Sequence, residues 1–99
     1  MIDVTVEQLS NMLNDKIDFT LVDVREPQEH ADYNIGGLLI PLTQLPERLE
    51  ELPKNKLTIV YCRSGGRSAH AVQFLQEMGF LDVRNLTGGM LAWADWIDI

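Results

Sequence analysis

The chain has 99 residues, which is enough for one domain around a single hydrophobic core and too few for two. Hydrophobic residues make up 45% of it and charged residues 23%, which is typical of a folded globular protein and excludes extensive disorder. The formal net charge of −7 disfavours nucleic acids and anionic membranes as partners, so we expect one globular domain over residues 1–99 that binds neither.

The first half of the chain alternates between helical and strand-like patterns. Thr5 and Gln8 have the spacing of a capping box, which starts a helix. Pro27 suits the first turn of a second helix. The predicted elements are a helix over 6–14, a compact β-branched strand over 19–24, a short helix over 27–31 and a brief strand over 38–40.

The second half continues this alternation. Leu45, Leu49 and Leu52 recur at helical spacing, and Pro53 ends that pattern. Gly79 is well placed for a left-handed cap at the end of a later helix. The predicted elements are a helix over 46–52, a strand over 57–61, a helix over 69–78, a strand over 83–86 and a helix over 90–96.

Strands that alternate with helices predict an α/β fold, with a small, mostly parallel sheet and helices on both faces. In such folds ligands bind at the carboxyl ends of the strands, where Asp23 and Cys62 both stand. Met90, Trp93 and Trp96 share one side of the last predicted helix. That spacing is typical of side chains that pack into the core.

The only cysteine, Cys62, comes between the apolar strand and the segment 63–68. This segment leads into a helix, whose first backbone amides lack partners and favour an anion. Cysteine reacts as a thiolate, and such amides together with nearby arginines lower its pKa. We therefore expect Cys62 to be a nucleophile. A buried, inert cysteine would explain the apolar strand before it but not the loop after it.

The residues after Cys62 are expected to bind the substrate: Arg63, Ser64, Gly65, Gly66, Arg67 and Ser68. The two arginines can hold an anionic donor or shield the charged sulfur, although either could instead form a structural ion pair. The two glycines permit positive φ and a close approach of the backbone to a ligand. The serine hydroxyls can donate to an anion, and we expect Ser68 mainly to cap the following helix.

Asp23 and Arg25 end a strand that should lie beside the cysteine strand. We expect them to form a structural ion pair or to brace the loop rather than to act directly in catalysis. His30 and His70 are not at a spacing that activates a nucleophile, and we expect both at the surface. No general base is needed if the loop already stabilises a thiolate.

A single cysteine excludes an internal disulfide and, with two distant histidines, makes a poor metal site. We expect neither a metal nor another cofactor. The start of the chain, residues 1–4, lacks the basic and apolar segments of a secretory signal. No run approaches the roughly 18 apolar residues of a membrane span. These features predict a reducing, cytoplasmic location.

Three segments, taken in this order, resemble the rhodanese family of sulfurtransferases and especially its single-domain members. They are Asp23-Val24-Arg25-Glu26-Pro27 with Glu29, Cys62-Arg63-Ser64-Gly65-Gly66-Arg67-Ser68, and Gly88-Gly89 followed by Trp93. The resemblance implies a rhodanese-like fold and a six-residue loop, Cys62 to Arg67, curled around the sulfur. This chain has Asn34 and Gly36 where many members have histidine and proline, which predicts a less rigid turn.

The resemblance also implies the reaction. Cys62 would take a sulfane sulfur from a small anionic donor such as thiosulfate and hold it as a persulfide. It would then pass that sulfur to a thiol, to cyanide or to a protein acceptor, as a thiosulfate:cyanide type of sulfurtransferase does.

Two other functions remain open. A cysteine phosphatase or arsenate reductase typically has arginine at the sixth position after its cysteine, whereas here Ser68 stands there and Arg67 comes one position early. The second is a non-catalytic rhodanese-like binding module or a persulfide relay to another protein. A relay uses the same chemistry at Cys62 and differs only in its acceptor.

Overall fold

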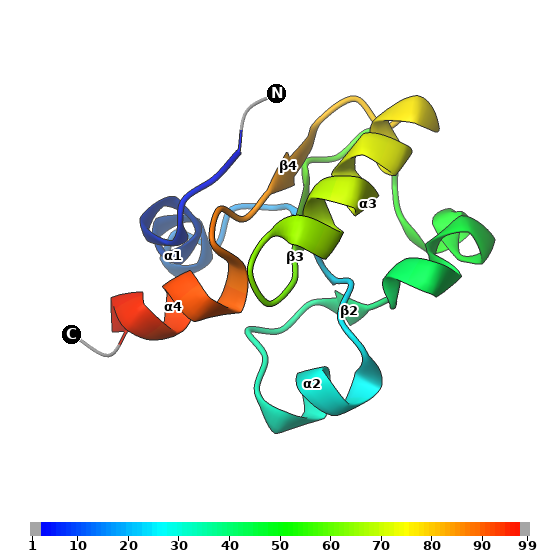
Figure 1. Cartoon of the computed structure of the whole chain (residues 1–99). Helices are drawn as coiled ribbons and strands as arrows, with labels where there is room; N and C mark the ends of the chain where they lie inside the picture. The colour runs from blue at the N-terminus through cyan, green and yellow to red at the C-terminus, as the bar shows by residue number, and fades with distance from the viewer. Residues whose placement is uncertain (1–2, 98–99) are drawn as a thin grey trace.

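The computed structural model describes residues 3–97, so the first two and last two residues of the expected domain lie outside the described residues. The strands of this part form one four-stranded sheet in the order β2-β1-β3-β4. Figure 1 shows a helix lying across β3 and β4. Every neighbouring pair is parallel. The strands are β1 (Thr20–Asp23), β2 (Leu38–Leu39), β3 (Thr58–Tyr61) and β4 (Val83–Asn85).

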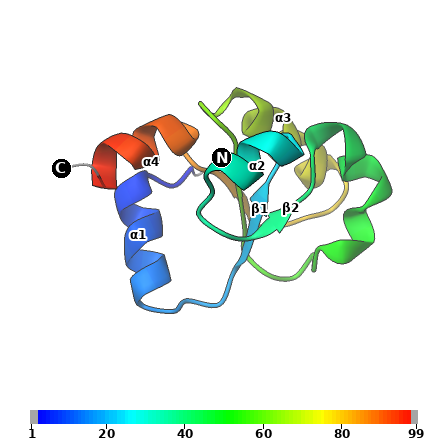
Figure 2. The same cartoon turned by 90° about the horizontal axis from the view of Figure 1, so that it is seen from below.

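Helices cover both faces of the sheet, which confirms the predicted fold class. Figure 2 shows helical segments on either side of the sheet. The first face carries α1 (Val6–Asn14) and α4 (Gly89–Ile97). The second carries α3 (Gly66–Glu77), η1 (Leu42–Glu47) and η2 (Leu49–Glu51). The short α2 (Pro27–Asp32) follows the carboxyl end of β1.

The sheet separates two clusters of buried apolar side chains, because successive residues of a strand point to opposite faces. In β3, Val60 belongs to the cluster under α3, and Ile59 and Tyr61 belong to the cluster under α1 and α4. Cys62 continues this alternation and lies in the first cluster. The alternation thus turns the cysteine toward the side of the sheet that carries α3.

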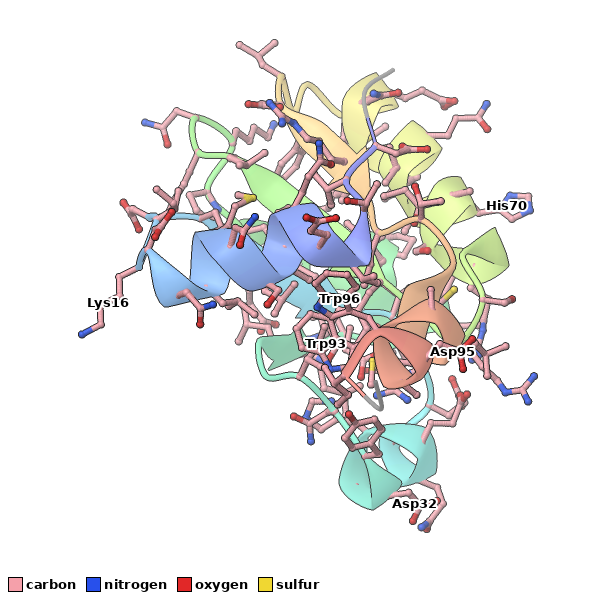
Figure 3. The ribbon with its side chains drawn as sticks, turned by 90° about the vertical axis from the view of Figure 1, so that its left-hand side faces the viewer. Lys16, Asp32, His70, Trp93, Asp95 and Trp96 are labelled. Carbon is pink, nitrogen blue, oxygen red and sulfur yellow. The ribbon has the colours of Figure 1, made fainter. Side chains whose placement is uncertain are left out.

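The predicted core stripe on the last helix is only partly correct. Met90 is buried and Trp93 packs against the second cluster. Trp96 remains 36% exposed, and Figure 3 shows both indole rings on the side of α4 that faces α1. Trp96 therefore lies at the edge of the core rather than inside it.

The predicted helix over 46–52 is wrong. The chain forms η1 and η2 instead, and Pro46 lies inside η1. Proline has no amide hydrogen and its ring clashes with a preceding carbonyl, so a regular α-helix is not sustained there. The capping box at Thr5 and Gln8 and the positive φ of Gly79 are both confirmed.

Candidate active site

The Cys62 side chain is 1% exposed and is surrounded by hydrogen-bond donors from the loop that follows it. Its sulfur accepts hydrogen bonds from the backbone amides of Gly65, at 3.1 Å, and Ser68, at 3.4 Å. The Ser68 hydroxyl oxygen lies 3.3 Å from the same sulfur. The chain curls around the sulfur because Gly65 adopts a φ of +105°, which side chains other than glycine's strongly disfavour.

These donors decide the ionisation of the thiol. Burial by itself raises the pKa of Cys62, because a charged sulfur loses its hydration. The Ser68 hydroxyl and the amides of Ser68, Gly65 and Ser64 act in the opposite direction, and together they lower the pKa below its ordinary value. The loop therefore favours the nucleophilic thiolate, as the sequence predicts.

Two expectations about this loop are wrong in detail. Gly65 has positive φ but Gly66 does not, and a methyl group added at Gly66 would meet no atom within 4 Å. Gly66 is the first residue of α3, and its N-cap is Gly65 rather than Ser68. Ser68 lies in the first turn of the helix instead, so its hydroxyl is free to face the sulfur.

Asn85, at the end of β4, is a site residue that the sequence analysis missed. Its Oδ1 accepts a hydrogen bond from the Ser68 hydroxyl at 2.5 Å, and its Nδ2 donates to the Gly65 carbonyl at 3.1 Å. One side chain thus holds both ends of the turn around the sulfur. The only available signal was its place at the carboxyl end of a parallel strand.

The start of α4 holds the other side of the loop. The amide of Met90 donates to the Cys62 carbonyl at 2.9 Å, and the amide of Leu91 donates to the Arg63 carbonyl at 3.0 Å. These bonds satisfy amides that a helix N-terminus otherwise leaves unpaired. Gly89 allows the contact, because a side chain there would clash with the carbonyl of Cys62. The glycine pair noted in the sequence is therefore part of the loop's support.

The two loop arginines differ in their surroundings. Arg67 forms a bidentate ion pair with Glu29 of α2, with its Nη1 and Nη2 atoms 2.7 and 2.9 Å from the two carboxylate oxygens. Hydrogen bonding to Arg67 lowers the pKa of Glu29 to about 2. Arg63 is exposed, as is Ser64, and Arg63 forms no ion pair with any residue between 3 and 97. Sequence spacing indicated neither the Glu29 partner nor this difference.

Asp23 and Arg25 form the expected ion pair, and both are buried. Burial raises the pKa of Asp23, but hydrogen bonds from Arg25 and His30 outweigh it and lower that pKa. Arg25 also donates from Nη2 to the carbonyl of Tyr33 at 2.7 Å, and its guanidinium lies 5.5 Å from the ring centre of Tyr61. The pair therefore fastens the end of α2 to the sheet.

His30 differs from the expected surface position. Its side chain is only 23% exposed, and its Nδ1 lies 2.8 Å from Oδ2 of Asp23. His70 is exposed as expected, and Figure 3 shows it pointing outward from α3. Neither histidine contacts Cys62 in the described structure, so the sulfur relies on its loop donors rather than on an imidazole.

The side chains and helices of residues 3–97 bear on metal binding and on membrane crossing. No cluster of three or more histidine, cysteine, aspartate or glutamate side chains there could hold a metal ion. None of the helices in the same range has the length and apolar character needed to cross a bilayer.

Known proteins resemble this chain along most of its length. Residues 5–95 match the family model described as the Rhodanese-like domain. A sulfurtransferase of Allochromatium vinosum is 44% identical over 89 residues, which cover 89% of this chain and 83% of that protein. A rhodanese-like domain protein of Staphylococcus aureus superposes with a TM-score of 0.87 at 36% identity, covering 94% of this chain and 91% of that one.

A third relative is much longer than this chain. The probable adenylyltransferase/sulfurtransferase MoeZ of Mycobacterium tuberculosis is 37% identical over 94 residues. The match covers 92% of this chain but 24% of that protein, so this chain resembles one part of it.

Proposed function

Because the chain belongs to the rhodanese-like family, we propose that it is a sulfurtransferase that carries a sulfane sulfur as a persulfide on Cys62. The observation that carries this proposal is the set of polar groups around the sulfur: two backbone amides donate to it, and the Ser68 hydroxyl oxygen lies 3.3 Å away. A thiolate and a terminal persulfide are both anions, and the same donors stabilise either one. The lowered pKa of Cys62 supports the role of attacking group.

The proposed reaction has two displacements at sulfur. The Cys62 thiolate attacks the outer sulfur of a donor such as thiosulfate, so that a new S–S bond forms while the old one breaks. Sulfite leaves with the bonding electron pair, and Cys62 holds the terminal persulfide. A nucleophilic acceptor, either cyanide, a thiolate or a protein thiol, then attacks the outer sulfur and releases the Cys62 thiolate. Neither displacement requires a metal or an organic cofactor.

The rest of the loop is proposed to bind the donor and the transferred sulfur. Arg63 and Ser64 are exposed residues of the loop that surrounds the sulfur and suit an incoming anion, while Gly65, Gly66 and Ser68 present backbone or hydroxyl donors. Arg67 carries the second positive charge of the loop, and it is paired with Glu29. Asp23 and Arg25 are proposed to brace the loop indirectly, since Arg25 holds the end of α2. A free Cys62 suits a reducing compartment, and we place the protein in the cytoplasm.

A persulfide relay to a protein acceptor is the second candidate. The long relative MoeZ, of which this chain matches 24%, is named as both an adenylyltransferase and a sulfurtransferase. That similarity favours a sulfur-transfer step in which the partner is another protein domain. The chemistry at Cys62 would be unchanged, and the acceptor alone would differ.

The test is the intact mass of the purified protein after incubation with thiosulfate, before and after addition of cyanide. The expected result is a gain of one sulfur atom that cyanide removes and that Cys62→Ser does not show. No gain, together with cysteine-dependent release of phosphate from an aryl phosphate, would overturn the proposal in favour of a phosphatase. A persulfide that cyanide leaves intact but a protein thiol removes would select the relay.

A further inference from the structure

Among the described residues, three charged side chains belong to the Cys62 loop or pair with it, and they come from two distant segments. Arg63 and Arg67 come from the loop itself, and Glu29 comes from α2, 38 residues before Arg67. The Glu29 carboxylate holds both terminal nitrogens of Arg67. Its Oε1 also accepts the amide hydrogen of Glu26 at 3.0 Å. The Glu26 backbone and the Arg67 side chain therefore both hold this carboxylate in place.

This arrangement changes the charge that a donor meets. An arginine binds an oxyanion best through two parallel N–H···O bonds, and here those two nitrogens are already bonded to Glu29. The ion pair has no net charge, whereas Arg63 pairs with none of the residues from 3 to 97 and keeps its positive charge. The Cys62 thiolate adds a negative charge within the loop. The site is therefore less suited to a doubly charged donor than the two arginines suggest.

We propose that Glu29 is a specificity-determining residue, which holds Arg67 away from the donor and thereby favours singly charged sulfane-sulfur donors over doubly charged ones. This inference rests on the proposed function, because it concerns the donor of the Cys62 persulfide. A dianion such as thiosulfate must displace the Glu29 carboxylate from Arg67 or bind beside its negative charge. A monoanionic alkanethiosulfonate carries half of that charge, so the Glu29 carboxylate repels it about half as strongly.

Thiosulfate and an alkanethiosulfonate react in the same way. In both, the Cys62 thiolate attacks the terminal sulfur, which is bonded to an oxidised sulfur that carries oxygen atoms. The new S–S bond forms as the old one breaks, and either sulfite or an alkanesulfinate leaves with the electron pair. The comparison therefore isolates the charge of the donor from the reaction at Cys62.

The test compares KM for thiosulfate and for methanethiosulfonate in the wild-type protein and in Glu29→Gln. Glutamine keeps an oxygen that can accept the Glu26 amide but removes the charge that holds Arg67. Because both partners of the pair are about a third exposed, at 37% and 31%, we expect KM for thiosulfate to fall about fivefold, with a much smaller change for methanethiosulfonate. Asp32→Asn makes the same charge change on α2, where Asp32 is exposed and contacts Gln28 (Figure 3). It should leave both KM values unchanged.

The ratio of KM for thiosulfate to KM for methanethiosulfonate should therefore fall in Glu29→Gln. If the folded variant keeps the wild-type ratio, the inference is overturned. If Glu29→Gln does not fold, the double variant Glu29→Gln with Arg67→Gln replaces the neutral ion pair by two neutral side chains. Because the inference holds that the paired Arg67 does not bind the donor, this variant should keep the wild-type ratio of KM for thiosulfate to KM for methanethiosulfonate. A ratio several-fold above the wild-type value would show that Arg67 binds thiosulfate despite Glu29, and it overturns the inference. A wild-type protein that forms no persulfide with either donor overturns the proposed function itself, and this inference with it.

Discussion

The hydroxyl of Ser68, in α3, donates a hydrogen bond to Oδ1 of Asn85 at the end of β4. The same oxygen lies 3.3 Å from the Cys62 sulfur. A hydroxyl has one hydrogen, so it cannot donate to both partners at once. While the hydrogen points to Asn85, the hydroxyl can accept from a protonated thiol, and it must turn toward the sulfur to stabilise the thiolate. Asn85 therefore competes with the sulfur for this hydrogen.

This competition predicts the effect of Asn85→Asp. A carboxylate in place of the amide is a stronger acceptor for the Ser68 hydrogen, and it places a negative charge close to the sulfur. Both effects disfavour the thiolate, so the pKa of Cys62 is expected to rise above its wild-type value. The pH dependence of Cys62 alkylation by iodoacetamide measures this pKa. The exposed Asn55→Asp is the control, and an equal or lower pKa in Asn85→Asp would contradict the prediction.

Ser68→Ala should slow sulfur transfer without abolishing it. The variant removes one donor to the sulfur and leaves the Gly65 and Ser68 amides in place, so the pKa of Cys62 should rise and the transfer rate fall about tenfold. It also leaves Oδ1 of Asn85 without its donor, which costs about 1–3 kcal/mol of stability. Single-turnover kinetics and thermal unfolding measure the two effects. Ser10→Ala on α1 serves as the control, and a wild-type rate in Ser68→Ala would contradict the assigned role.

Asp23→Asn should destabilise the protein strongly. The change leaves the Arg25 guanidinium buried without its counter-ion, and breaking such a buried pair costs about 3–5 kcal/mol. Urea unfolding at neutral pH measures the loss. Asp18→Asn removes the partner of Lys56 from a surface pair in which Asp18 is 87% exposed, and it should change stability little. Equal effects of the two variants would show that burial does not matter here.

The lowered pKa values of two carboxyl groups predict that the protein loses stability in acid. Asp23 and Glu29 have lowered pKa values in the folded protein, that of Glu29 about 2, so folding favours their charged forms. Such groups stabilise the fold above their unfolded pKa of about 4, and this contribution is lost as pH falls through the folded pKa. The free energy of unfolding should therefore be level from about pH 7 to 5 and fall below that.

Urea unfolding at a series of pH values checks this expectation. Glu29→Gln should show a smaller fall between pH 5 and about 2, because one of the two groups no longer titrates. The difference should be modest, since the Glu29 side chain is 31% exposed and its ion pair is screened by solvent. A steeper fall in Glu29→Gln than in the wild type would reverse the predicted sign.

Gly89→Ala should separate α4 from the cysteine loop. The added carbon would clash with the carbonyl of Cys62 and lie 2.7 Å from the carbonyl oxygen of Arg63, at a φ of +56° that alanine disfavours. We expect lower thermal stability and slower persulfide formation, because the Met90 and Leu91 amides lose their fixed acceptors. Gly66→Ala, where a methyl group meets nothing within 4 Å, should not lower the melting temperature. Similar melting temperatures in the two variants would contradict this account.

Local patterns in the sequence were sufficient for the elements and for the position of the nucleophile. The capping box at Thr5 and the left-handed cap at Gly79 follow from the order of a few neighbouring residues, and both are present. Strands alternating with helices indicated the parallel sheet, and Cys62 follows its strand at the carboxyl edge. Pro46 shows the limit of such patterns, since leucines at helical spacing did not outweigh a proline that cannot donate.

The partners around the nucleophile were decided by the tertiary structure. Glu29 meets Arg67 across 38 residues, and Asn85 meets Ser68 across 17. These meetings depend on the strand order β2-β1-β3-β4, which brings α2 and the end of β4 to the two sides of the Cys62 loop. Spacing along the chain determines which residues share a helix face or a strand end. Which distant side chains then touch is decided by the packing of the sheet, because that packing alone sets their separation in space.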